Sequence, residues 1–417
     1  MLSDHSRFIM NLQKRVERVI EQSIASKEVA GVNVLFRMYG SELVYAEAGL
    51  ADIEHKKPIR RDTIFRLFSM TKPVTAVAAM ILFERGDIDL MQSVGDILPA
   101  YRKLSVFENG VKRDLNEPLL IQDLLNMTAG LSYPDGSTPT GMMTEELFKE
   151  LDNRLDTPNE MTTRELADRL AEIPLDFVPG TSYRYSTCAD VLGAVIEEVT
   201  GLRFSEFLKK EIFDRLGMED TGFYIPKEKL SRRAEAYRTV ENEDGCRDFV
   251  KYDWNNLGIK NRADSAPAFE SGGAGLVSTI DDYSKFSEML MNDGEYNGER
   301  ILLPGTVQYM TERCMPHKLT KAFQRMMWHY EGFSYSNLMR ICYDDKKSGY
   351  ITSPGEYGWD GWLGTYFENF PDTGATLLIG TQKVDSGTFM LTRKIRNTIL
   401  AQILSVSSIE GEDLDFD

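Results

Sequence analysis

The sequence predicts an α+β protein in which an antiparallel β-sheet is flanked by helices and a mostly helical lobe is inserted. Three observations support this fold class. Strand-like segments lie near both ends of the chain, helical and turn-rich segments fill the middle, and a long apolar helix ends at the first boundary. We therefore expect residues 1–86 and 269–417 to form the sheet lobe, residues 87–268 the helical lobe, and the active site to lie between them.

The N-terminal segment contains a helix and a strand pair. Residues 4–26 place their apolar side chains on one stripe, which predicts a long amphipathic helix. Residues 31–38 and 42–49 read as strands around a three-residue turn, so a β-hairpin follows. Residues 51–63 are polar and are predicted to be irregular.

A buried helix follows within residues 64–86. From Val74 onward this segment is rich in alanine and large aliphatic residues, so the helix is expected to be buried on nearly all sides. Pro73 fits the first turn, where a missing N–H is tolerated, and this places the helix start close to Ser69. Gly86 ends the helix as a C-terminal cap.

The middle of the chain is read as short helices joined by loops. Residues 119–127, 162–172 and 190–199 carry helical patterns. Residues 132–141 contain two prolines and two glycines among small polar residues, and this composition predicts an exposed loop. Residues 321–343, rich in aromatic residues and methionine, are assigned to the helical lobe.

Strands and helices alternate again towards the C-terminus. A helix at 281–291 is expected to be capped by Ser278 or Thr279. The other predicted elements are the end of a strand at 276–278, two antiparallel strands at 358–370 and 375–382, and a last helix at 387–404. The acidic end, residues 409–417, is expected to be disordered.

Composition excludes several classes of function. The chain has 417 residues and a formal charge of −17, which argues against a nucleic-acid partner because such surfaces need basic stripes. No apolar run is long enough to span a bilayer, and the N-terminus lacks the regions of a signal peptide, so we expect a cytoplasmic protein with no membrane partner. The sequence does not specify the oligomeric state.

The cysteines and histidines indicate neither a metal site nor a cofactor. Four cysteines lack metal-type spacing and are expected to be reduced thiols in or near the core: Cys188, Cys246, Cys314 and Cys342. The four histidines are scattered. A Ser-His-Asp triad stays open because triads assemble in space, but no Gly-x-Ser-x-Gly turn supports one.

Ser69 and Lys72 stand three residues apart at the start of the apolar helix, so hydroxyl and amine lie on one face. A serine hydroxyl needs an adjacent base, and a desolvated lysine can lose its proton near pH 7. Backbone N–H groups at the helix start can stabilise an oxyanion. The pair therefore indicates a nucleophile and its proton acceptor, although an ordinary helix start can show the same spacing.

Three blocks in order resemble the serine β-lactamase and penicillin-binding-protein superfamily. The resemblance is closest to its class C-like branch, which includes the family VIII carboxylesterases. The blocks are Ser69-Met-Thr-Lys72, Tyr185-Ser-Thr187 and Trp359-Asp-Gly361, and Ser271-Gly-Gly-Ala-Gly-Leu276 also looks like the family's strand entry. Together they are far more specific than the first block alone.

The resemblance implies that Ser69 is acylated, that Lys72 accepts its proton, and that Tyr185 is a second base and acid. On this reading the cationic lysine lowers the pKa of the Tyr185 phenol, which passes a proton to the leaving group and then activates water. No metal or organic cofactor is implied.

The third block departs from the Lys-Thr-Gly of β-lactamases. Trp359 occupies the lysine position, so the cation that would bind a substrate carboxylate is missing there. Strand alternation points Trp359 and Gly361 towards the site and Asp360 away, and the glycine would let substrate approach the backbone. The N–H of Trp362, paired with that of Ser69, is expected to form the oxyanion hole.

The second block also departs, because Thr187 stands where β-lactamases keep asparagine. Both changes favour a serine hydrolase that acts as a carboxylesterase on small uncharged acyl esters, with a small-molecule ester or amide as its partner. A D-amino-acid peptidase or amidase and a weak β-lactamase are the enzymatic alternatives. A non-catalytic binding or scaffold member is the alternative of another class, but the intact Ser69, Lys72 and Tyr185 argue against it.

Overall fold

The computed structural model describes residues 4–409, and its centre is an eight-stranded sheet in which neighbouring strands pair antiparallel. The strand order is β12-β13-β14-β15-β16-β1-β2-β3. The bounds are β1 Gly31–Met38, β2 Ser41–Asp52, β3 Lys57–Pro58, β12 Phe333–Ser336, β13 Met339–Cys342, β14 Tyr357–Asp360, β15 Tyr366–Phe370 and β16 Ala375–Thr381. The sheet therefore joins strands from both ends of the chain, as the sequence predicts.

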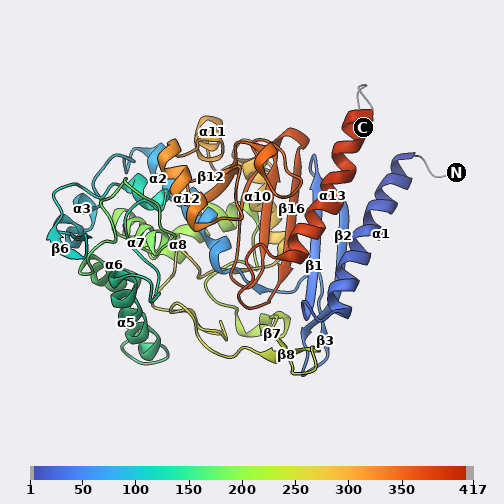
Figure 1. Cartoon of the computed structure of the whole chain (residues 1–417), viewed down its shortest axis with the longest axis horizontal. Helices are drawn as coiled ribbons and strands as arrows, with labels where there is room; N and C mark the ends of the chain where they lie inside the picture. Colours follow the sequence, from blue (N-terminus) through green and yellow to red (C-terminus); the bar gives the residue numbers. More distant parts are fainter. Residues whose placement is uncertain (1–3, 410–417) are drawn as a thin grey trace.

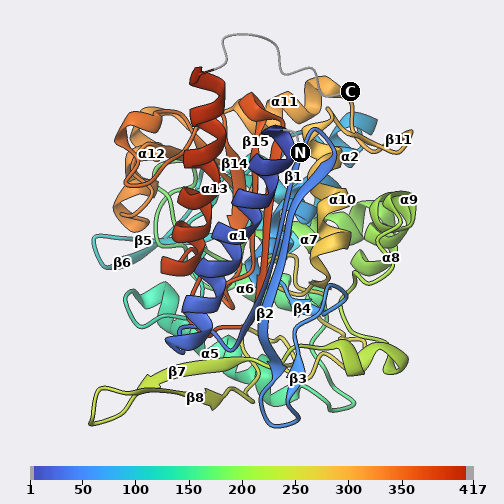
Figure 2. The ribbon, with the colours of Figure 1, turned by 90° about the vertical axis from the view of Figure 1, so that its right-hand side faces the viewer.

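Two terminal helices cover one face of the sheet. The helices α1 (Asp4–Ala25) and α13 (Met390–Ile409) lie side by side across it (Figures 1 and 2). Leu12, Val16 and Ile20 of α1 are buried against strand residues, which confirms the apolar stripe of the sequence. The helices pack on β1 and β16, among other strands. These two strands pair antiparallel, with Val34 opposite Ile379.

The opposite face carries the apolar helix and its neighbours. Helix α2 (Thr71–Arg85) is buried from Thr71 to Leu82 and ends at Gly86, whose φ of 75° is left-handed, as a C-terminal cap requires. Helix α10 (Ile280–Met291) contacts β15 and β16, and the Thr279 side chain caps it by accepting from the Asp282 N–H. Both predicted helices are thus confirmed, and Thr279 rather than Ser278 is the cap.

The middle of the chain supplies the helices drawn at the left of Figure 1. Their bounds are α3 Val94–Ile97, α4 Ile121–Leu125, α5 Pro139–Arg154, α6 Thr163–Ala171, α7 Cys188–Thr200, α8 Phe204–Leu208 and α9 Asp214–Leu216. Helices α11 (Pro304–Glu312) and α12 (His317–Met326) follow α10. The predicted helices at 119–127, 162–172 and 190–199 correspond to α4, α6 and α7.

Short strand pairs interrupt these helices, and of their strands the sequence analysis predicted only the one at 277–278. The pairs are β4 Phe65–Arg66 with β9 Val277–Ser278, β5 Ser105–Glu108 with β6 Val111–Asp114, β7 Tyr237–Glu241 with β8 Arg247–Lys251, and β10 Glu295–Tyr296 with β11 Glu299–Arg300. The β7–β8 hairpin contacts the end of a strand of the large sheet. The Tyr237 N–H donates to the carbonyl of Gln382, the residue after β16, at 3.0 Å.

Three local predictions were wrong. The strand expected at 358–370 is two strands, β14 and β15, because a turn closes between them where the Gly364 N–H donates to the Gly361 carbonyl at 2.8 Å. Residues 321–343 were assigned to the helical lobe, but only their first part is helical. The second part forms β12 and β13, at one edge of the large sheet. Residues 51–63 are less irregular than predicted, because β2 extends to Asp52 and β3 pairs with it.

The segment 132–141 is not an exposed loop throughout. Ser132 is buried, and α5 already begins at Pro139, where the Thr138 side chain caps it by accepting from the Gly141 N–H. Small polar side chains in this segment form hydrogen bonds with backbone groups inside the protein. The same residue types also occur in exposed loops, so composition alone does not distinguish a buried segment from an exposed one.

The remaining predictions concern the thiols and the C-terminus. Cys188 and Cys342 are buried and Cys314 is partly buried, whereas Cys246 is exposed and so lies outside the expected core. Of the acidic end, residues 410–417 lie outside the described residues, while Ile409 is the last residue of α13. Within residues 4–409 no helix combines the length and apolar character needed to cross a bilayer.

Candidate active site

The chain places Ser69 at the junction of a 3-10 turn, Phe68–Met70, and helix α2. Phe68 adopts a φ of 46°, a left-handed conformation that a bulky residue rarely takes and that stores local strain. The Phe68 ring packs against the Trp362 ring with centroids 5.0 Å apart, which helps to hold this conformation. The turn thus presents Ser69 at the N-terminal end of the buried helix.

Lys72 lies one turn further along and is completely buried. Its Nζ atom is 3.1 Å from Ser69 Oγ, 3.0 Å from the Tyr133 hydroxyl and 2.8 Å from the Gly273 carbonyl oxygen. Burial lowers the pKa of Lys72 to about 7, although the Asp190 carboxylate acts in the opposite direction. An amine with this pKa is partly unprotonated at neutral pH and is positioned to accept the proton of Ser69.

Tyr185 belongs to the segment that precedes α7, and its hydroxyl accepts a hydrogen bond from Trp359 Nε1 at 3.0 Å. Lys72 Nζ lies 4.6 Å from the centre of its ring. Burial raises the pKa of Tyr185 above its usual value, and hydrogen bonds with the side chains of Ser69 and Trp359 only partly offset this. The expected lowering by the lysine cation is therefore wrong, because desolvation of the phenolate outweighs it.

Tyr133 is a site residue that sequence reasoning missed. It follows buried Ser132 in the segment predicted to be an exposed loop, and its hydroxyl accepts a hydrogen bond from Lys72. Its ring lies 5.7 Å from that of Tyr185, so two phenols flank the amine. No local motif in the sequence marks this tyrosine, because its contact with Lys72 depends on the path of the whole segment.

A glycine-rich segment completes the surroundings of Lys72. Asp190 of α7 accepts hydrogen bonds from the Ser271 hydroxyl at 2.5 Å and from the Gly273 N–H at 3.0 Å. A Cβ atom on Gly272 would lie 2.2 Å from the Ala189 carbonyl oxygen, so only glycine fits there. These contacts fix the Gly273 carbonyl that receives a hydrogen bond from Lys72.

The third sequence block contributes in different ways from those expected. Trp359 lies beside Tyr185 and is only 2 % exposed. Gly361 packs against the protein itself, since a Cβ there would lie 2.2 Å from the Leu67 carbonyl oxygen. Trp362 is half-buried, and its Nε1 donates to Asp385 at 2.7 Å. The close approach at Gly361 thus brings the 361–364 turn against the turn that carries Ser69.

These side chains open into a cavity of about 940 Å³. Its wall includes Ser69, Tyr185, Trp359 and Trp362, together with residues from the α12–β12 connection and the start of α13. Lys72 is not part of this wall, but it contacts two residues that are, Ser69 and Tyr185. Among residues 4–409 no group of three or more His, Cys, Asp or Glu side chains is placed to hold a metal ion.

Comparison with known proteins identifies the family. A β-lactamase family model matches residues 16–401. The chain belongs to the β-lactamase family. A relative in this family, Protein Rv1367c of Mycobacterium tuberculosis, is 32% identical over 342 residues, which cover 80% of each chain.

Other proteins similar to this chain carry names that describe ester and acyl chemistry. Esterase EstB of Burkholderia gladioli is 31% identical over 292 residues, which cover 67% of this chain and 70% of that protein. The solved structure of EstCE1, described as a hydrolase with promiscuous acyltransferase activity, superposes with a TM-score of 0.78 at 26% identity and covers 94% of this chain and 99% of that one. Both the family and the fold are thereby established.

Proposed function

We propose that this protein is a serine hydrolase that forms an acyl-enzyme on Ser69 and acts as a carboxylesterase on small uncharged acyl esters. The observation that carries the proposal is the 3.1 Å contact between Ser69 Oγ and the amine of Lys72, whose pKa burial lowers to about 7. A neutral amine at this distance can take the hydroxyl proton as the oxygen attacks the ester carbonyl.

The hydrogen bonds of Lys72 define its role in the two protonation states. The ammonium has three N–H groups, which match the three oxygen atoms of Ser69, Tyr133 and Gly273. The neutral amine has two N–H groups and one lone pair. With the N–H groups on Tyr133 and the Gly273 carbonyl, the lone pair faces Ser69, which is the arrangement needed for proton transfer.

The proposed reaction has two halves. Ser69 Oγ bonds to the carbonyl carbon, its proton moves to Lys72, and the alkoxide leaves with a proton delivered through Tyr185. In the second half the oxygen of water bonds to the acyl carbon as its proton moves to Tyr185 and Lys72. The bond from this carbon to Ser69 Oγ then breaks, the proton returns to Ser69, and the acid leaves. Because the pKa of Tyr185 is raised, we assign its hydroxyl the role of a neutral relay between Ser69, the lysine and the leaving group.

The oxyanion of each tetrahedral intermediate needs hydrogen-bond donors. We propose the backbone N–H groups of Ser69 and Trp362, because the turns that carry them are in contact through Gly361 and the Leu67 carbonyl. A preference for an uncharged acyl group follows from Trp359, whose indole replaces the ammonium that would bind a carboxylate.

The family relatives support ester chemistry over the enzymatic alternatives. Esterase EstB is named for that activity, and the description of EstCE1 adds acyl transfer, in which an alcohol replaces water in the second half. We regard acyl transfer as a second candidate function, and peptidase, amidase and β-lactamase activities as weaker alternatives. The four free cysteines support our proposal of a cytoplasmic location, because reducing compartments keep thiols unpaired.

The decisive experiment combines labelling with a substrate series. A fluorophosphonate probe should label the wild-type protein and not Ser69→Ala, with the site confirmed by peptide mass spectrometry. Hydrolysis of p-nitrophenyl butanoate should exceed that of nitrocefin in kcat/KM. An unlabelled folded protein would favour the non-catalytic scaffold, and faster nitrocefin turnover would overturn the ester preference. Added alcohol that yields a new ester would support acyl transfer.

A further inference from the structure

The composition of the cavity wall is unusual for a pocket that would receive a short aliphatic chain. Six aromatic residues line it: Tyr185, Trp328, Tyr330, Tyr350, Trp359 and Trp362. Met327 is the aliphatic side chain of substantial size among the described lining residues, which include no valine, leucine or isoleucine. Small-molecule pockets in general mix aromatic and aliphatic walls.

The cavity is also much larger than a small acyl group. A butanoyl group fills roughly 150 Å³ if each heavy atom takes about the volume of a liquid water molecule, whereas the cavity measures about 940 Å³. Most of the space next to Ser69 is therefore available to the rest of the substrate. Its aromatic lining then determines what that part of the substrate can be.

Two of the aromatic faces are held in fixed orientations. The Trp362 indole donates to Asp385 at 2.7 Å, and its ring packs on Phe68 at 5.0 Å and on Tyr252 at 5.4 Å. Trp359 is fixed by its hydrogen bond to Tyr185 and by edge-to-face packing on Tyr335 at 5.1 Å. Preorganised faces of this kind lose little side-chain freedom when a ligand binds.

Trp328 adds a third aromatic surface at the rim. It lies in the connection between α12 and β12, and its side chain is 81 % exposed although it lines the cavity. A large apolar side chain so exposed gains contact area when a ligand covers it. Trp328 therefore extends the aromatic wall outward from the buried part of the site.

From these observations we infer that the substrate carries a planar aromatic group, bound against the accessible rings of Trp328 and Trp362, while the buried Trp359 holds Tyr185 in place beside them. The inference rests on the proposed function, since it names the substrate class of the same site. Aromatic rings gain edge-to-face and offset-stacked contacts on such walls beyond the effect of area burial. The group belongs either to the leaving alcohol, which leaves the acyl part small, or to the acyl part.

A sugar ring also stacks on aromatic faces, but it needs free polar groups around its hydroxyls. The two aspartates of the cavity are already engaged: Asp360 accepts from the Tyr330 hydroxyl at 2.9 Å, and Asp385 accepts from Trp362. Lys347 of the cavity wall pairs with Asp344 at 2.6 Å. Glu331 and Arg393 also line the cavity, so a sugar is the competing ligand that the experiment has to exclude.

The test uses ester pairs of similar intrinsic reactivity with the full-length protein. One arm compares naphthylmethyl acetate with butyl acetate, and the other compares ethyl phenylpropanoate with ethyl butanoate. We expect the aromatic ester to have about tenfold or more the kcat/KM of its aliphatic partner in at least one arm, which also identifies the side of the ester that carries the ring. Aliphatic preference in both arms, or a stronger preference for an acetylated methyl glucoside, would overturn the inference.

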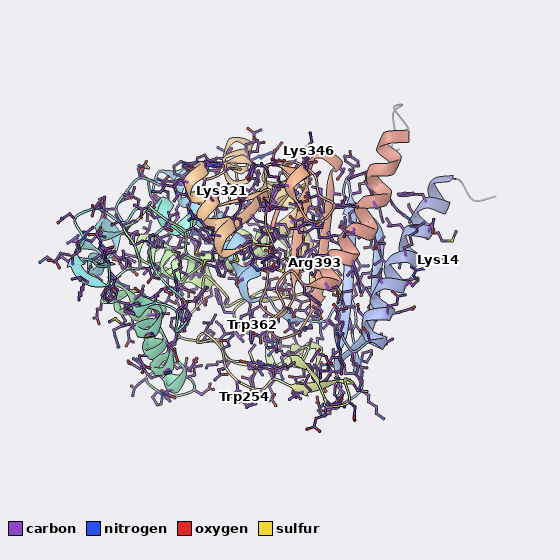
Figure 3. All side chains as sticks on the ribbon, in the orientation of Figure 1. Lys14, Trp254, Lys321, Lys346, Trp362 and Arg393 are labelled. Atoms are coloured by element: carbon purple, nitrogen blue, oxygen red, sulfur yellow. The ribbon has the colours of Figure 1, made fainter. Side chains whose placement is uncertain are left out.

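Matched tryptophan variants locate the aromatic contact. Trp328→Leu should reduce the aromatic-to-aliphatic ratio about threefold or more, because leucine keeps apolar area and loses the π-face. Trp254→Leu is the control, since Trp254 is also exposed, at 67 %, but lies outside the cavity wall, on the segment below Trp362 in Figure 3. An equal fall in both variants would contradict the assignment.

Binding to Ser69→Ala separates this inference from the proposed function. Calorimetric titration should give tighter binding of naphthylmethyl acetate or ethyl phenylpropanoate than of its aliphatic partner, whether or not the wild-type protein hydrolyses esters. If the aromatic esters bind and none is turned over, the proposed function fails and the aromatic site stands. If esters are hydrolysed and neither aromatic ester binds more tightly, the inference fails and the proposed function stands.

Discussion

The indole N–H of Trp359 donates a hydrogen bond to the hydroxyl of Tyr185 across 3.0 Å, although the two residues are 174 positions apart in the chain. The residue that replaces the substrate-binding lysine of β-lactamases is thus bonded to a proposed catalytic phenol. This bond uses one lone pair of the Tyr185 oxygen and leaves its proton free to be directed towards Ser69.

Replacing Trp359 by phenylalanine should therefore affect chemistry more than binding. Trp359→Phe keeps an aromatic ring and removes the donor, so we expect kcat to fall about threefold to tenfold, the usual worth of one neutral hydrogen bond. Steady-state kinetics with p-nitrophenyl butanoate measure this change. Tyr335→Phe is the control, because the Tyr335 ring packs on Trp359 while its hydroxyl has no hydrogen-bond partner among the described residues. A fall confined to binding, seen as a higher KM alone, would contradict the assigned role.

The lowered pKa of Lys72 predicts a pH dependence. In the proposed mechanism the neutral amine is the active form, so kcat/KM should rise about tenfold per pH unit below pH 7 and level off above it, as the lysine with a pKa of about 7 loses its proton. The raised pKa of Tyr185 predicts no second titration of that phenol below pH 9. Initial rates between pH 5 and pH 9 test both statements, and a flat profile across that range would exclude Lys72 as the titrating base.

The same shift makes stability depend on pH. The folded protein holds Lys72 with a pKa of about 7, while the unfolded chain keeps the ordinary value of 10.5, so the unfolded state binds more protons between the two values. Stability from this group therefore rises with pH, by about 2 kcal/mol from pH 7 to pH 9. Lys72→Met removes this contribution. The free energy of unfolding should therefore increase more in the wild-type protein than in the variant between pH 7 and pH 9. Urea unfolding of both proteins at the two pH values measures the difference, and parallel curves would contradict the shift.

Tyr133 should orient Lys72 through the hydrogen bond that its hydroxyl accepts. In Tyr133→Phe the amine loses one of its acceptors, so its lone pair is less firmly directed at Ser69 and kcat should fall about tenfold. The ammonium also loses an acceptor, so the midpoint of the pH profile should move to lower pH. A merely structural tyrosine would lower thermal stability and leave that midpoint unchanged.

A buried ionic cluster behind the cavity should determine the stability of its wall. Arg340, Arg396, Glu356 and Glu368 are completely buried, and Arg396 binds Glu356 at 2.9 Å and Glu368 at 3.0 Å while Arg340 also binds Glu368. Neutralising one member leaves an uncompensated charge, so Glu368→Gln should cost about 3–5 kcal/mol of unfolding free energy.

Chemical denaturation of a matched pair measures this cost. Glu146→Gln makes the same chemical change in an exposed ion pair with Lys149, where solvent screens the charges and a much smaller loss is expected. Equal losses in the two variants would show that the buried cluster is not the source of the effect.

Much of the fold follows from local patterns in the chain. The amphipathic stripe of α1, the apolar run of α2 with Gly86 after it, and the β1–β2 hairpin depend on side-chain periodicity and on the conformations that glycine and proline allow. Residues 358–370 were read as one strand because their alternation continues through the turn. The turn exists because Gly361 packs against the carbonyl of Leu67, a contact nearly three hundred positions away.

For the candidate site, the sequence by itself identified Ser69 and Lys72 as candidates from their spacing, and Tyr185 as a candidate from the family resemblance. These signals are local, so they can be read from neighbouring residues. Tertiary structure alone decided that Lys72 is fully buried with a pKa of about 7, that burial raises rather than lowers the pKa of Tyr185, and that Tyr133 contacts the amine. The physical reason is that desolvation and hydrogen-bond partners depend on which distant segments exclude water from a group, and one-dimensional spacing does not contain that information.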